Sequence, residues 1–194
     1  MGHRVEIQSV YIGPEDSPFD IHISVLNAWK NKCDGRLAPS WSEYSLLDFP
    51  SSEIPFISLT DLSNSPLHSV YRFWGTGLTQ VFGGDYTGKT PADVPPRSLG
   101  ISSNGGCARL VKDLAPHYEV KEFLRDNGVF GRALVLRLPF SDDDKTVNHG
   151  INMYKFELNG AESPLKTYFD EVFSKVSSDV PAPKLSNVSH KIPV

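Results

Sequence analysis

Three consecutive apolar segments in the C-terminal half constrain this chain more than any other feature. Residues 129–140 are strongly apolar throughout, which is typical of a central strand buried on both faces. Residues 118–124 precede this segment across a turn at 126–128, and residues 147–158 follow it across the charged turn 141–145. Because short turns between strands favour hairpins, we expect three antiparallel strands in succession.

A second hairpin is predicted upstream, where residues 54–62 and 67–74 alternate on either side of a turn at 63–66. In residues 67–74, strict alternation places Tyr71 and Phe73 on one face. Between the two groups of strands we expect a short helix that Gly83 ends, and a longer helix at 103–115. This order predicts an α+β fold in which helices cover one face of a five-stranded antiparallel sheet.

Amphipathic helices are predicted before and after these strands in the chain. One begins at Ser17 and Pro18, a capping residue followed by proline, and the other begins in the same way at Ser163 and Pro164. The 194-residue length fits one domain. We divide it into an N-terminal segment at 1–16, a domain with its first flanking helix at 17–160, a C-terminal amphipathic helix at 161–180 and a flexible tail at 181–194.

Charge and cysteine content narrow the functional classes. Lysine and arginine number 19 against 23 acidic residues, a net charge of −4, which disfavours a nucleic-acid-binding protein. The two cysteines, Cys33 and Cys107, are too few for a disulfide framework and indicate a reducing compartment. The first ten residues lack the apolar core of a signal peptide, and no segment is apolar enough to span a membrane. We therefore expect a cytoplasmic protein that binds neither membrane nor nucleic acid.

One motif at the strand-to-helix junction resembles a known family. The stretch YRFWGTGL at 71–78, followed by Phe82-Gly83 and by DYTGK at 85–89, is similar to this junction in PAS domains. It looks most like a bacterial family of stand-alone PAS-like proteins, with weaker similarity in RLAP at 36–39 and LRLP at 136–139. The resemblance covers residues 26–158. It implies a PAS-like sensory or interaction domain, often dimeric, with no catalytic residue and no fixed cofactor.

A small-ligand pocket is expected between the helix at 103–115 and the facing sheet. Amphipathic aromatic residues and arginines that could bind an anionic group are the candidate ligand-binding residues: Tyr71, Arg72, Phe73, Arg109, Tyr118 and Tyr154. The alternative is that the aromatic side chains fill the core and the arginines face water.

No cofactor is predicted, although haem and flavin stay open as alternatives. Asn104 to Leu110 superficially resembles the flavin-attachment motif of light-sensing PAS domains, but Cys107 falls on a buried helical stripe, which favours a structural thiol. His117 and His149 are the candidate haem ligands. The spacing of Gly83, Gly88, Lys89 and Thr90 matches a phosphate-binding loop, yet no parallel strand precedes it. Asp142–Asp144 we interpret as a solvated turn.

The function expected from the resemblance is a sensory or regulatory module that binds a small molecule or a protein partner. Such a module would signal by protein contact, as a homodimer or with a signalling partner, and the helix at 165–176 could supply the surface. A cup-shaped isomerase, with Glu122 as base and Tyr118 as oxyanion donor, is one alternative. A ligand-free structural adaptor is another.

Overall fold

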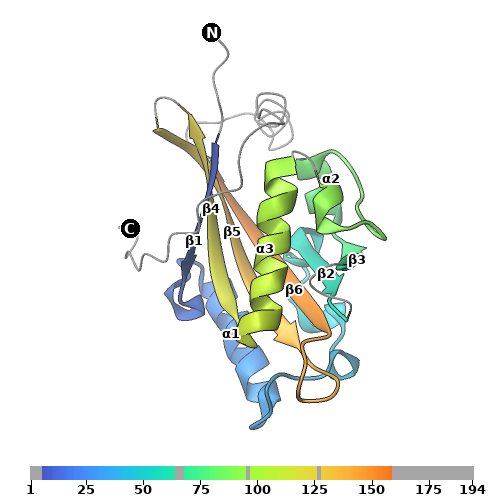
Figure 1. The fold of residues 1–194 in the computed structure, drawn as a ribbon. Helices are drawn as coiled ribbons and strands as arrows, with labels where there is room; N and C mark the ends of the chain where they lie inside the picture. The colour runs from blue at the N-terminus through green and yellow to red at the C-terminus, as the bar shows by residue number, and fades with distance from the viewer. Residues whose placement is uncertain (1–5, 64–67, 95–96, 126–127, 159–194) are drawn as a thin grey trace.

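The computed structural model describes residues 6–63, 68–94, 97–125 and 128–158 (Figure 1). The predicted C-terminal helix at 161–180 and the tail at 181–194 lie outside the described residues. The described part is an α+β fold in which an antiparallel sheet lies between helices.

Six strands form this sheet in the order β1-β4-β5-β6-β2-β3. Their bounds are β1 Glu6–Ile12, β2 Ile57–Asp61, β3 Val70–Trp74, β4 His117–Arg125, β5 Gly128–Phe140 and β6 His149–Leu158. The predicted succession of three antiparallel strands is confirmed as β4, β5 and β6, with β5 central among them. The upstream hairpin is confirmed as β2 and β3, although residues 54–56 form a 3₁₀ turn before β2 begins.

The prediction of five strands was wrong, because the segment assigned to the N-terminus contains a sixth. Strand β1 pairs antiparallel with β4 along its whole length, from Glu6 opposite Leu124 to Ile12 opposite Tyr118. Its Ile7, Ser9 and Tyr11 are all buried, as expected for the inward face of an edge strand. Only a partner strand far along the chain reveals this short, partly polar alternation as a strand.

Helices cover both faces of the sheet and not one face as predicted. Helix α1, Asp20–Cys33, packs on one face, while α2, Thr76–Phe82, and α3, Arg97–Asp113, lie on the other (Figure 1). The physical reason is visible in β5, where successive residues from 133 to 138 are at most 2% exposed although they point alternately to opposite faces. A strand buried in this way needs a layer on each side.

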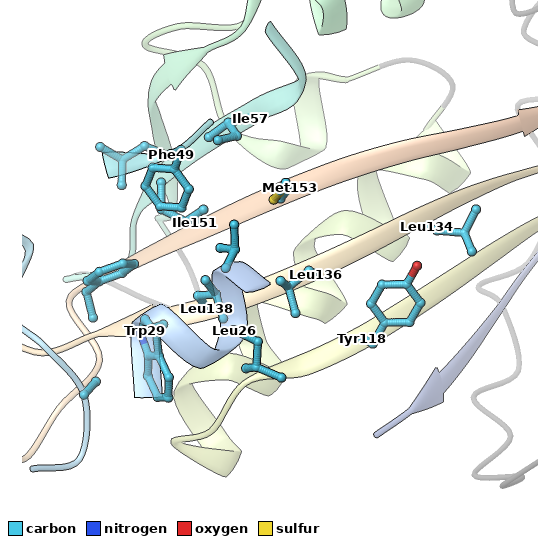
Figure 2. Close-up of a cluster of buried hydrophobic side chains, with 14 of the residues drawn as sticks. Leu26, Trp29, Phe49, Ile57, Tyr118, Leu134, Leu136, Leu138, Ile151 and Met153 are labelled. Carbon is cyan, nitrogen blue, oxygen red and sulfur yellow. The ribbon is translucent and has the colours of Figure 1, made fainter. Parts of the chain in front are cut away.

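The face toward α1 holds an apolar core (Figure 2). Leu26 and Trp29 of α1 pack among side chains from the three central strands: Tyr118, Leu134, Leu136, Leu138, Ile151 and Met153. The Trp29 indole Nε1 donates a hydrogen bond to the carbonyl oxygen of Pro139 at 2.9 Å, which fixes the helix against β5. Burying each large apolar side chain contributes about 1.5–3 kcal/mol.

A β-bulge in β3 overturns the predicted alternation of its side chains. Leu59 is opposite Phe73 and Thr60 is opposite Tyr71, so Arg72 is the extra residue. Because one additional residue shifts the pleat, Tyr71 and Phe73 point to opposite faces of the sheet. Tyr71 packs on the α2 side and Phe73 packs against the α1-side core.

Helix ends differ from the predictions by a few residues. Helix α1 begins at Asp20, and the Ser17 hydroxyl accepts a hydrogen bond from the Phe19 N–H at 3.3 Å before it. Helix α3 begins at Arg97, six residues earlier than predicted. Gly83 ends α2 as expected, with a φ of 76° that favours glycine.

Candidate functional site

A surface pocket of about 410 Å³ opens where the C-terminal end of α3 meets β1 and β4. Its lining comes from the end of β1 and the turn after it, the last turn of α3, the link from α3 to β4 and the first residue of β4: Tyr11, Ile12, Gly13, Pro14, Arg109, Asp113, Ala115, Pro116 and His117. Leu114 adopts a left-handed φ of 53°, and Pro116 cannot continue a helix, so the chain turns sharply into β4. This turn brings the last turn of α3 beside the first residue of β4.

Arg109, Asp113 and Tyr11 form a contact group at the pocket. The Arg109 guanidinium carbon lies 4.4 Å from the centre of the Tyr11 ring, a cation–π contact. The Arg109 Nε is 3.1 Å from an Asp113 carboxylate oxygen, although the two are not aligned as a hydrogen bond. Two residues one helical turn apart therefore bring a positive and a negative group into contact at the pocket.

His117 is the buried member of the lining, with a relative exposure of 6%. Its ring meets the Tyr11 ring edge-on at 5.4 Å, and neither ring nitrogen has a hydrogen-bond partner among the described residues. Burial, together with the charge of Arg137, lowers the pKa of His117 to about 3. Burying a neutral imidazole whose two nitrogens make no hydrogen bond costs free energy. We therefore interpret His117 as a polar group whose hydrogen-bond partners a ligand or water would supply.

Beneath the pocket, the Tyr11 hydroxyl leads into a buried cluster of charges. It donates a hydrogen bond to Glu119 Oε1 at 3.4 Å. The other Glu119 oxygen accepts from Arg137 Nε at 3.1 Å and from Arg137 Nη2 at 2.7 Å, while Lys121 Nζ lies 3.8 Å from Oε1. All three charged side chains are at most 1% exposed.

Neutral polar groups complete this cluster between α3 and the sheet. From α3, Ser102 donates to Glu119 at 3.1 Å and Ser103 accepts from Lys121 at 3.0 Å. On the strand side, Arg137 Nη1 donates to the Asn152 side-chain oxygen. The Asn152 amide nitrogen then donates to Ser58 and to Thr60, each at 3.1 Å. The hydrogen bonds thus run from the pocket across the sheet to β2.

Electrostatic interactions keep these groups charged despite burial. Desolvation alone would raise the pKa of Glu119, but Lys121 and Arg137 outweigh it and hold that pKa at about 2. Burial lowers the pKa of Lys121 to about 8 against the attraction of Glu119. Glu119 thus stands between two cations and is the group on which both depend.

Gly106 allows α3 to lie directly over Arg137. A Cβ atom at Gly106 would stand 2.5 Å from Arg137 Nε and 2.6 Å from Cζ, closer than atoms can approach. The neighbouring Gly105 faces open space. The two glycines therefore have different roles, and only Gly106 is required for the guanidinium to fit under the helix.

The six candidate ligand-binding residues do not come together. Arg109 lines the pocket, whereas Tyr71 and Tyr154 are buried in the core on the α2 side. Tyr118 and Phe73 belong to the opposite, α1-side core. Arg72 is exposed and pairs with Asp61 at 2.6 Å. Sequence reasoning missed Tyr11 and Asp113, and it considered His117 only as a haem ligand.

Cys107, His149 and the turn at Asp142–Asp144 lie outside the lining of the pocket. Cys107 is 1% exposed, and burial raises the pKa of its thiol, as a structural cysteine requires. His149 Nε2 stands 3.5 Å from Asp142 Oδ2. Asp143 accepts hydrogen bonds from the backbone N–H groups of Lys145 and Thr146 in the same turn, and Asp144 accepts one from the Leu37 N–H. Within the described ranges, no group of three histidine, cysteine or acidic residues is placed to hold a metal ion.

The loop with phosphate-loop spacing pairs with a strand edge instead of opening a long helix. Tyr71 N–H donates to Lys89 O at 2.9 Å and Gly88 N–H donates to Tyr71 O at 2.8 Å. The 3₁₀ turn that follows, Pro91–Asp93, has three residues. This context lacks the helix N-terminus that binds phosphate in such loops.

The residues of the isomerase alternative stand apart. Tyr118 and Glu122 are four positions apart on β4, which corresponds to roughly 13 Å along a strand. Glu122 accepts a hydrogen bond from Arg132 Nε at 2.9 Å, and Tyr118 is 0% exposed in the apolar core. A base and an oxyanion donor acting on one small substrate need to be much closer.

Comparisons with family models, with curated proteins and with solved structures give no match to this chain. The site must therefore be interpreted from its own chemistry. Among the helices that the structure describes, none is both long and apolar enough to cross a membrane.

Proposed function

We propose that this chain is a sensory or regulatory binding module of the PAS-like type, which binds a small molecule in the pocket at the end of α3. When the ligand is bound, the module signals through contact with another protein. The observation that carries this proposal is the 410 Å³ pocket with His117 at its wall, a buried imidazole whose nitrogens lack partners among the described residues. Buried polar groups of this kind are typical of sites that a ligand or bound water completes.

The connection between pocket and sheet supports a role in signalling. Tyr11 contacts Arg109 at the pocket, and its hydroxyl donates to Glu119 in the buried charge cluster. A ligand that moves Tyr11 changes the hydrogen bonding of a group on which Lys121 and Arg137 both depend. The pocket thus has a physical route to the centre of the sheet.

The order of elements supports the PAS-like assignment. Two paired strands, a helical excursion through α2 and α3, and three hairpin-linked strands follow one another along the chain. Strand β1 is an addition at the edge beside β4. Because one fold serves many functions, this order supports the class of protein and does not identify the ligand.

A fragment screen tests the binding proposal. The probe is a library of small neutral, cationic, anionic and zwitterionic compounds, and the readout is the melting temperature of the protein. Ala115→Trp places a large side chain at the pocket, whereas Ala92→Trp makes the same change at another exposed site. We expect hits that stabilise the wild type and the Ala92 variant but not the Ala115 variant. Compounds that raise the melting temperature of the Ala115→Trp variant as much as that of the wild type would contradict the proposal.

Self-association is part of the proposal and needs its own measurement. The resemblance implies a homodimer, and sedimentation velocity over a range of concentrations distinguishes a dimer from a monomer. A monomer at every concentration would remove the dimer and leave a hetero-partner as the route of signalling.

A further inference from the structure

We infer that the pocket at the end of α3 binds a small zwitterion of the α-amino acid class, its carboxylate on Arg109 and its ammonium group on Asp113. The inference rests on the proposed function, because it names the ligand class for the same pocket. Three observations lead to it: the charge balance of the lining, the geometry of the Arg109–Asp113 pair and the apolar character of the remaining wall.

The charge balance disfavours ligands of a single sign. Arg109 is the positive and Asp113 the negative group of the lining, and His117 is neutral. An anion would meet Asp113 and the negative end of the α3 dipole, both unfavourable. A cation would meet Arg109, whose charge, like that of Arg137, lowers the pKa of His117, while Glu119 acts in the opposite direction. A ligand carrying both charges is attracted by each group and repelled by neither when it is correctly oriented.

The Arg109–Asp113 pair leaves binding capacity free for such a ligand. The Arg109 Nε lies 3.1 Å from Asp113 Oδ2 without hydrogen-bond alignment. The terminal guanidinium nitrogens make no hydrogen bond to described residues, and they present the planar fork that binds carboxylates through two parallel hydrogen bonds. Asp113 has a second oxygen, and it lies at the C-terminal end of α3, where helix carbonyls lack intrahelical partners and can accept from an ammonium group.

The order of the two charges along α3 gives the ligand an orientation. Arg109 precedes Asp113 by one turn, so the positive group lies nearer the middle of the helix and the negative group at its C-terminal end. Side chains at this spacing leave the helix about 5–6 Å apart, measured between their Cβ atoms. Their forked side chains can therefore engage the adjacent carboxylate and ammonium of one α-amino acid.

The rest of the wall fits an apolar side chain. Ile12, Pro14, Ala115 and Pro116 line it with carbon, and the Tyr11 ring adds an aromatic surface. A volume of about 410 Å³ lies within the usual range for small-molecule sites and exceeds what the two charged groups of an amino acid fill. We therefore expect apolar amino acids to bind more tightly than charged ones.

Calorimetric titration of the full chain with the common L-amino acids tests the inference. For the tightest amino acid, the controls are the amine that lacks its carboxylate and the acid that lacks its amino group. We expect at least one apolar amino acid to bind, and each control to bind about tenfold more weakly or worse, because each loses one charge-assisted contact. Equal binding of the amino acid and either control would overturn the zwitterion.

Two variants locate the binding at the two charges. Arg109→Gln and Asp113→Asn each remove one charge at a partly exposed position, and both should weaken amino acid binding at least tenfold. Arg72→Gln is the matched control, since Arg72 pairs with Asp61 away from the pocket. Circular dichroism shows whether each variant is folded. If both pocket variants are folded and bind as the wild type does, the inference is wrong.

The fragment screen distinguishes a wrong ligand class from a wrong proposed function. If fragments bind at the pocket, as judged by their loss in Ala115→Trp, but no amino acid does, the ligand class is wrong and the binding module stands. If neither fragments nor amino acids bind, the proposed function fails together with the inference.

Discussion

Glu119 and Arg137 show how strongly one buried residue can depend on another. Glu119 lies between Lys121 and Arg137, all three nearly inaccessible to solvent. Replacing Glu119 by Gln leaves two cations without their partner, whereas replacing Arg137 by Gln leaves Glu119 paired with Lys121. Removing one member of a buried ion pair costs about 3–5 kcal/mol. We expect Glu119→Gln to reach at least that loss of unfolding free energy in urea, and Arg137→Gln to cost less.

The exposed pair Arg72–Asp61 is the control for this comparison. Its Arg72 side chain is 60% exposed, so Asp61→Asn should cost about 1 kcal/mol or less. A Glu119→Gln variant as stable as the Asp61 variant would show that the buried charges are not a coupled group.

Helix α3 packs close to the sheet because Gly106 has no side chain where the helix lies over Arg137. Gly106→Ala would drive a methyl group into the Arg137 guanidinium, and overpacking of this kind costs about 1–3 kcal/mol. Gly105→Ala, one position earlier, meets no atom within 4 Å and should stabilise the helix by about 0.5–1 kcal/mol. Thermal unfolding of the two variants should shift their melting temperatures in opposite directions. Shifts of the same sign would contradict the packing described for α3.

Elements predicted from the sequence were correct where the pattern is local. Hairpin turns and an apolar central strand identified β4, β5 and β6, and glycine identified the end of α2. The edge strand β1 was missed because its partner β4 is distant in the chain, and the bulge at Arg72 was missed because it depends on the exact register between β2 and β3. The alternation of Glu119 and Lys121 between apolar neighbours marks a polar row inside a strand. Its partners on β5 and α3 follow only from the three-dimensional register.

The pocket could not be predicted from the sequence, because its residues come from segments that are distant in the chain. Tyr11 and Arg109 are almost a hundred residues apart, and they meet because β1 pairs with β4 and α3 ends beside both. Of the predicted ligand-binding residues, Arg109 alone lines this pocket. Tyr71, Tyr118 and Tyr154 contribute instead to the buried cores on the two faces of the sheet.

For the whole molecule, two buried neutral histidines predict sensitivity to mild acid. Burial lowers the pKa of His22 to about 4, and that of His117 to about 3, from the usual 6.5. Below pH 6.5 these two histidines bind protons in the unfolded chain but stay neutral in the folded chain, so the free energy of unfolding decreases as the pH falls. Between pH 7 and pH 5 we expect a loss of about 2–4 kcal/mol, measured by urea unfolding.

Substitution of both histidines distinguishes their contribution to the pH dependence of stability from that of the carboxylates. Glu119 adds its own loss of stability only as the pH falls below about 4.5, where the carboxylates of the unfolded chain become protonated. A variant with His22→Gln and His117→Gln should therefore lose most of the slope between pH 7 and pH 5. His68→Gln, at an exposed position, should keep it. A slope that survives the double substitution would assign the acid sensitivity to other groups.

The central claim is that the pocket beside His117 is a binding site, and the imidazole itself is the most direct reporter. Nitrogen-15 NMR of the His117 ring distinguishes the two neutral tautomers from each other and from the charged form. On addition of a compound that stabilises the protein, the account predicts a shift of the His117 ring nitrogens that is absent in Ala115→Trp and present in Ala92→Trp. Unchanged His117 resonances with a saturating, stabilising compound would contradict the claim.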